Sequence, residues 1–153
     1  MLIVHVLLSL VGIVTGFVVA WGMLRGDPMP RWTDIFLGTT VLTSLTGFLL
    51  PATKFLPSHA TGILSLLILA VTLYAWYGRK LGGRWRAIYA GTAIAALYFN
   101  VFVLVVQAFL KLEPLKALAP QQNEPPFVAA QAMVLIAFVA LGIFAVKRFR
   151  ART

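Results

Sequence analysis

The side chains of this chain that could take part in the most kinds of chemistry are those of its two histidines, His5 and His59. An imidazole can ligate a haem iron or hold the oxygen of a quinone. Each histidine stands near the start of a long apolar run, and small residues (Ser9, Gly12 and Gly16) follow His5 at helical spacing. We therefore expect a shared site that admits a flat ring, with both histidines as iron ligands if that ring is haem b. In the alternative interpretation, the small residues only let helices pack closely, and the histidines meet water near a membrane interface.

Three amide side chains extend this candidate site. Asn100 and Gln107 share one face of an apolar run, and Gln131 opens the last run. Because hydrocarbon offers a polar side chain no partner, these amides are candidates for binding a ligand together with the histidines. For Asn100, expected near the middle of the bilayer, we favour a hydrogen bond to another helix. The predicted ligand-binding set is His5, His59, Asn100, Gln107 and Gln131.

No catalytic motif is recognisable in the sequence. The chain has no cysteine, which excludes disulfides, thiolate metal sites and a thiol nucleophile. It also has no glycine-rich phosphate loop, nucleophile elbow or zinc-type spacing. No Asp or Glu lies deep in an apolar run, which argues against a proton-coupled pump. These observations leave open whether the protein is an enzyme.

The elements that must position these residues are membrane-spanning helices. Of the 153 residues, 61% are hydrophobic and 11% are charged, which is more apolar surface than a soluble domain of this size can bury. A lone span needs about 20 apolar residues and satisfies its backbone polar groups only as a helix. We therefore predict one all-α domain, a bundle of five transmembrane helices. The expected spans are 2–24, 35–53, 59–77, 87–110 and 127–146.

The basic residues predict the orientation of this bundle. Ten of the 13 Lys and Arg residues fall on one side of the expected spans, whereas Lys54, Lys111 and Lys116 fall on the other. The positive-inside rule then puts the C-terminus in the cytoplasm and the N-terminus outside, and all four tryptophans lie at cytoplasmic span ends. We expect the basic loops to contact anionic lipid. Their placement between apolar runs argues against nucleic acid as a partner.

Two further segments have alternative interpretations. The span at 35–53 is rich in threonine and serine, whose hydroxyls can bond to carbonyls of their own helix. We favour a packing face there, and the alternative is a polar path for a solute. The loop from Lys111 to Pro125 contains Pro114, which suits the first turn of a short helix. That helix is expected at the membrane surface, as a simple connector or as a lid over the external cluster.

Four stretches of the sequence carry a resemblance to known proteins. They are Thr43–Pro51, Pro57–Gly62, Leu97–Gln107 and Lys116–Phe127. Together with the lengths of the spans, they make nearly the whole chain resemble a group of small bacterial inner-membrane proteins with no assigned activity. The resemblance implies a bacterial inner-membrane location. It implies no mechanism and no catalytic residue.

The sequence thus leads to one expected function and two alternatives. We expect a non-enzymatic multi-pass membrane protein that is either an accessory subunit or a binder of a small ligand. Its expected partners are another membrane protein or further copies of itself in a homo-oligomer. The first alternative is a redox protein that binds haem or quinone with His5 and His59. The second alternative is a transporter or channel for a small uncharged solute.

Overall fold

The structure is a computed structural model that describes residues 2–49 and 57–150. These residues form helices and their connections, which confirms the prediction of an all-α protein. The long helical stretches are α1 (Leu2–Leu24), α2 (Pro30–Leu49), α3 (Pro57–Leu73) with its π-helical continuation η1 (Tyr74–Gly78), α4 (Trp85–Lys111) and α6 (Pro125–Arg150). A short helix, α5 (Glu113–Leu118), lies between α4 and α6.

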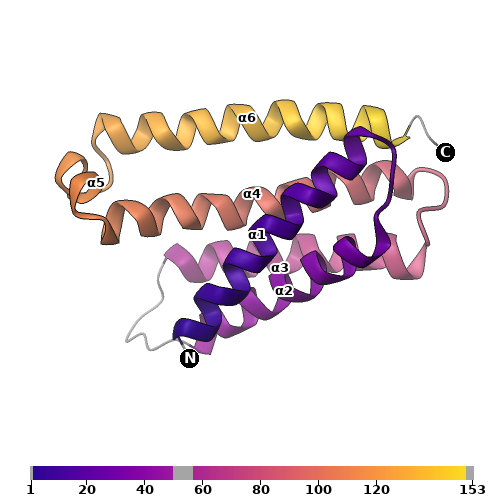
Figure 1. Ribbon diagram of the computed structural model, residues 1–153, viewed down its shortest axis with the longest axis horizontal. Coiled ribbons are helices and arrows are strands. Elements are labelled where there is room, and N and C mark those ends of the chain that lie inside the picture. Colours follow the sequence, from indigo (N-terminus) through magenta and orange to yellow (C-terminus); the bar gives the residue numbers. More distant parts are fainter. Residues whose placement is uncertain (1, 50–56, 151–153) are drawn as a thin grey trace.

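The long helices run back and forth along one axis of the molecule (Figure 1). α1, α3 and α6 run in one direction, and α2 and α4 run in the other. The start of α1, the start of α3 and the short helix α5 therefore lie at one end of the bundle, and the C-terminal end of α6 lies at the other. α6 lies along α4, while α1 crosses the bundle diagonally.

Four helical stretches are long and apolar enough to cross a membrane, which indicates a multi-pass membrane protein. They are Leu2–Leu24, His59–Gly78, Trp85–Lys111 and Pro125–Arg150. Their outward side chains are apolar, as contact with lipid requires; on α6, Met133 is 71% and Ile136 is 69% exposed. α2 has a comparable length of 20 residues. Its five threonines and Asp34 make it less apolar than the other four.

The ends of the helices differ from the expected spans by a few residues. α1 has the expected bounds, but α2 begins at Pro30 and not at residue 35. The reason is local: the Thr33 N–H donates to the Met29 carbonyl at 3.0 Å, and the Thr33 hydroxyl donates to the Pro28 carbonyl at 2.9 Å. Residues 50–53, the expected end of this span, lie outside the described residues. α6 continues to Arg150, where cations suit the negative end of the helix dipole.

The helix expected at 59–77 is α-helical only up to Leu73 and continues as the π-helical segment η1. The Arg79 N–H donates to the Tyr74 carbonyl, five residues back, at 2.8 Å. A Cβ on Gly78 would lie 2.8 Å from Cδ2 of Tyr74, so the wide turn closes on a residue that has no side chain. The Tyr74 ring in turn packs edge-on against Trp85, with 5.0 Å between ring centroids. The segment η1, which continues α3, thus packs against the start of α4.

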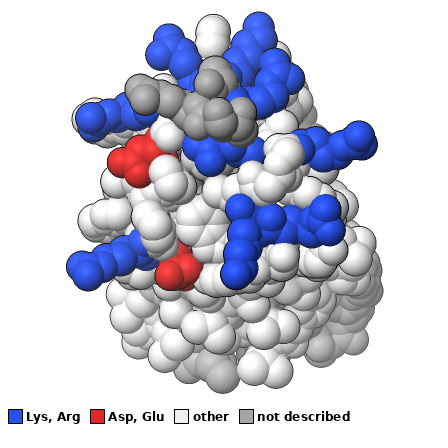
Figure 2. Space-filling view, turned by 90° about the vertical axis from the view of Figure 1, so that its right-hand side faces the viewer, with Lys and Arg blue, Asp and Glu red and all other residues white. Residues whose placement is uncertain are grey.

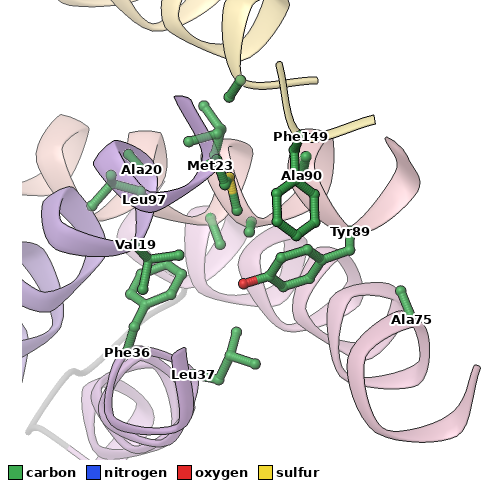
Figure 3. Close-up of a cluster of buried hydrophobic side chains, with 14 of the residues drawn as sticks. Val19, Ala20, Met23, Phe36, Leu37, Ala75, Tyr89, Ala90, Leu97 and Phe149 are labelled. Carbon is green, nitrogen blue, oxygen red and sulfur yellow. The ribbon is translucent and has the colours of Figure 1, made fainter. Parts of the chain in front are cut away.

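The apolar core fills the half of the bundle near the C-terminal end of α6 (Figure 3). Tyr89 of α4 is fully buried, and its ring centroid lies 5.6 Å from that of Phe149 of α6. α1 reaches this core through Gly16. A Cβ on Gly16 would lie 2.5 Å from Cδ1 of Leu97 and 2.9 Å from Cε1 of Phe36. α1 therefore approaches α2 and α4 this closely only because residue 16 is glycine.

Basic side chains gather at the same end of the molecule (Figure 2). The α1–α2 and α3–α4 connections lie there with their adjoining helix turns and the last turn of α6 (Figure 1). These segments carry Arg25, Arg31, Arg79, Lys80, Arg84, Arg86, Lys147, Arg148 and Arg150. Arg152 and Lys54 lie outside the described residues. We call this region the basic end; Lys111 and Lys116 lie at the opposite end, at the close of α4 and in α5.

Arg86 connects three parts of the basic end. Its Nε donates to the Phe149 carbonyl at 2.7 Å, and its guanidinium carbon lies 3.9 Å from the centroid of the Phe149 ring. A terminal nitrogen donates to the Gly26 carbonyl at 3.4 Å. A cation that binds the last carbonyls of a helix is favourable because those carbonyls have no partner within the helix. Arg86 therefore links the start of α4 to the end of α6 and to the α1–α2 connection.

Candidate ligand-binding site

A cavity of about 150 Å³ lies among α1, α2, α3 and α4, away from the basic end. Four of the five predicted ligand-binding residues line it: His5 from α1, His59 from α3, and Asn100 and Gln107 from α4. The two histidines therefore meet at one cavity, although they come from helices that are not consecutive. Whether they bind a ligand there stays a prediction.

Gln131, the fifth predicted residue, does not line this cavity. It lies on α6, and its Nε2 donates to the Phe102 carbonyl of α4 at 3.3 Å. Its Oε1 is buried and has no hydrogen-bond partner. α6 packs against α4 and contributes no residue to the cavity. The amide of Gln131 therefore joins two helices and lies apart from the other four residues.

His5 is held against α2. Its Nδ1 lies 2.9 Å from Oγ1 of Thr46, and a Cβ on Gly47 would lie 3.4 Å from Cε1 of His5. The Thr46 hydroxyl donates its own proton back to the Leu42 carbonyl at 2.8 Å. It therefore accepts the hydrogen bond from His5, which assigns the imidazole proton to Nδ1. In that tautomer Nε2 has a free lone pair that can accept a hydrogen bond or ligate a metal.

His59 is stacked on a ring from α2. Its centroid lies 5.6 Å from that of Phe48, with 14° between the ring planes. The same phenyl ring covers Gly62, since a Cβ there would lie 3.1 Å from Cε2 and Cζ of Phe48. Below His5, a Cβ on Gly12 would lie 3.2 Å from Oγ1 of Thr39. Gly12 and Gly62 thus allow close helix packing, which is the role that the alternative interpretation gives to small residues.

Asn100 joins α4 to α2 at the edge of the cavity. Its Nδ2 donates to Oγ1 of Thr40 at 3.2 Å, and the two residues are 7% and 0% exposed. This is the interhelical hydrogen bond that the sequence analysis favours for Asn100. Because Asn100 also lines the cavity, the bond fixes the position of one polar wall.

Two residues of the cavity were not singled out as candidate ligands from the sequence. Thr43 of α2 is 8% exposed and Ser65 of α3 is 4% exposed. Both line the cavity, and neither hydroxyl oxygen has a hydrogen-bond partner among the described residues. Sequence pattern cannot reveal this, because other hydroxyls of the same helices bond to their own backbone; Thr39 donates to Ile35 at 2.7 Å and Thr72 to Ile68 at 2.9 Å.

The loop between α4 and α6 does not cover this cavity. Its short helix is present as expected, with Pro114 in the first turn of α5. The Nε2 atom of Gln122 donates to the Val106 carbonyl at 3.0 Å, which ties the loop to α4. No residue from α5 or from its connection to α6 lines the cavity. The loop is therefore a connector in this structure.

Comparison with known proteins adds no functional assignment to this geometry. No protein-family model, curated protein or solved structure matches the chain. The function must therefore be argued from the cavity itself.

The lining of the cavity sets the kind of ligand that it can hold. Among the described residues that line it, the polar groups are imidazoles, hydroxyls and amides, with no carboxylate, lysine or arginine. These groups suit an uncharged molecule with hydrogen-bonding oxygens or nitrogens. Within residues 2–49 and 57–150, no group of three or more His, Cys, Asp or Glu could hold a metal ion. A volume near 150 Å³ is about that of a cavity that takes one benzene ring.

Proposed function

We propose that this chain is a non-enzymatic membrane protein that binds one small uncharged ligand in the cavity among α1, α2, α3 and α4. The observation that carries the proposal is the pair of unpartnered hydroxyls on Thr43 and Ser65. Leaving a buried polar group without a partner costs about 1–3 kcal/mol, so native proteins retain few such groups. Both residues line the same cavity, and we propose that a single occupant, reached by a rotation of each side chain, supplies both missing partners.

A quinone head group is the ligand class that these walls suit best. It is one six-membered ring with two carbonyl oxygens, which accept hydrogen bonds from hydroxyls and amides. The stacked rings of Phe48 and His59 supply a flat apolar surface beside those donors. A porphyrin joins four rings, so haem b would require the helices to move apart around a cavity of about 150 Å³. The size therefore favours the quinone form of the redox alternative over the haem form.

The membrane arrangement is part of the same proposal. We propose that α2 is a fifth span, because it runs antiparallel to α1 and α3 and packs against both. Five crossings with the basic end in the cytoplasm put the N-terminus and the cavity toward the outside. The resemblance to small bacterial inner-membrane proteins supports a bacterial inner membrane as the location. If the chain is an accessory subunit, its partner is another membrane protein; alternatively, it assembles with further copies of itself as a homo-oligomer.

The test is the ligand content of the purified full-length protein. Quinone is extracted and measured against phospholipid, for the wild type and for the double variant Thr43→Val/Ser65→Ala. We expect quinone above the membrane background in the wild type and at background in the variant. Thr72→Val is the matched control, because Thr72 is fully buried in α3 but bonds to its own helix outside the cavity. It should retain quinone as the wild type does.

Three results would overturn parts of this proposal. Quinone at background in the wild type excludes the quinone form, and a Soret absorption band would favour haem instead. A large loss of stability in Thr43→Val/Ser65→Ala relative to quinone-free wild type would show that ordered water already partners both hydroxyls, since removing a truly unpartnered group is neutral or stabilising. Solute flux through protein-containing liposomes would favour the transporter alternative, which the back-bonded hydroxyls of α2 do not support.

A further inference from the structure

The outer face between α4 and α6 has a groove of about 540 Å³, separate from the candidate ligand-binding cavity. Gly91 of α4 and Gly142 of α6 line it. A Cβ on Gly91 would lie 3.7 Å from Cγ2 of Val146, and a Cβ on Gly142 would lie 3.6 Å from Cγ2 of Ile94. Both are ordinary van der Waals distances, so the packing of these helices does not require glycine at either position. The two glycines instead keep the groove open.

The two ends of the groove differ in chemistry. Tyr98 and Phe138 line it toward the middle of the bundle, with 5.7 Å between their ring centroids. Lys147 and Arg150 line it at the basic end. Apart from these two cations and the Tyr98 hydroxyl, the side chains that line the groove are apolar. The groove is therefore apolar along its length and positively charged at one end.

The dimensions match one acyl chain of a phospholipid. The apolar part of α6 that lines the groove extends from Leu135 to Val146, which is about 17 Å at 1.5 Å per residue. One leaflet of a bilayer is about half of the 30 Å hydrocarbon core. A chain that enters from the basic end therefore finds an apolar path at least as long as its own leaflet is thick.

We propose that this groove binds one anionic phospholipid, with an acyl chain along Gly91 and Gly142 and the phosphate at Lys147 and Arg150. Charge complementarity decides between this occupant and a second copy of the chain. Two copies in one membrane have the same orientation, so a dimer through this face would bring their basic ends together. The cations would then repel, whereas an anionic head group neutralises them.

The test uses the full-length protein in a neutral detergent, titrated with phosphatidylglycerol or with zwitterionic phosphatidylcholine and observed by native mass spectrometry. We expect the wild type to retain phosphatidylglycerol in preference. Lys147→Gln/Arg150→Gln should bind it about 30-fold more weakly, because each basic side chain at a membrane surface contributes a factor of about five. Arg31→Gln/Arg84→Gln removes two charges from the same end but outside the groove, and should change little.

Gly142→Leu tests the apolar part of the groove with both cations intact. It should also lose the retained phosphatidylglycerol, with no fall in melting temperature in lipid-free detergent. Equal weakening by the two charge variants would overturn the proposal, because attraction would then be diffuse over the basic end. A doubled mass that Gly142→Leu abolishes would show that a second copy occupies the groove. Stabilisation by inorganic phosphate as large as that by phosphatidylglycerol would indicate a site for a free anion and would equally overturn it.

Discussion

Gly16 is the point at which α1 comes closest to its neighbours, and we predict that Gly16→Ala destabilises the bundle. The added Cβ would lie 2.5 Å from Cδ1 of Leu97 and 2.9 Å from Cε1 of Phe36. These residues are 0% and 1% exposed, so neither has free space into which it can move. Forcing a methyl group into a packed core costs about 1–3 kcal/mol, while replacing glycine by alanine in a helix gains about 1 kcal/mol. The net loss is therefore up to about 2 kcal/mol.

Gly38→Ala is the matched control for this prediction. Nothing lies within 4 Å of a Cβ on Gly38, so this variant has the helix-propensity gain without a clash. The difference between the two variants in free energy of unfolding isolates the packing cost, about 1–3 kcal/mol. Unfolding in mixed micelles of sodium dodecyl sulfate and a neutral detergent, followed by circular dichroism, measures it. Equal stabilities of the two variants would refute the close approach of α1 to α2 and α4.

The same unfolding assay tests two polar contacts, and a reporter fusion tests the topology. Arg86→Met keeps an unbranched side chain but loses the bonds to the end of α6, and should cost about 1.5 kcal/mol, the low end for bonds to a charged group. Arg84→Met should stay within about 0.5 kcal/mol of the wild type, and an equal cost for both would contradict the role of Arg86. Asn100→Leu and Thr40→Val should couple by about 0.6 kcal/mol in a double-mutant cycle; strictly additive effects would exclude their hydrogen bond. A reporter fused after Thr153 should be cytoplasmic, and an external reporter would contradict the proposed span count and orientation.

The sequence predicts the helices of this protein well because apolar runs and their breaks are local signals. α1 has the expected bounds, and the other long helices begin or end a few residues beyond theirs. The π-helical segment η1 was not expected, since it depends on the fit between Tyr74 and Gly78 and not on composition. The start of α2 was missed because hydrogen bonds of Thr33 extend the helix into residues that are less apolar than the span.

The candidate site could be predicted only in part, because residue type indicates which side chains could bind a ligand but not which of them meet in the fold. Residue type and depth single out His5, His59 and Asn100, and three-dimensional packing places them around one cavity. Thr43 could not be told apart from Thr46, because both are threonines on α2 within one turn of each other. Only the structure shows that Thr46 donates to the Leu42 carbonyl while the Thr43 hydroxyl is left without a partner.

The length of α6 has a consequence for the surrounding bilayer. α6 has 26 residues, about 39 Å at 1.5 Å per residue, whereas the hydrocarbon core is about 30 Å thick. Its apolar part, residues 127–146, is about 30 Å long at 1.5 Å per residue and matches the core, and the last turn with Lys147, Arg148 and Arg150 extends beyond it. A bilayer of longer chains would cover this charged turn with hydrocarbon, which is unfavourable. We therefore expect lipids with longer chains to be depleted along α6.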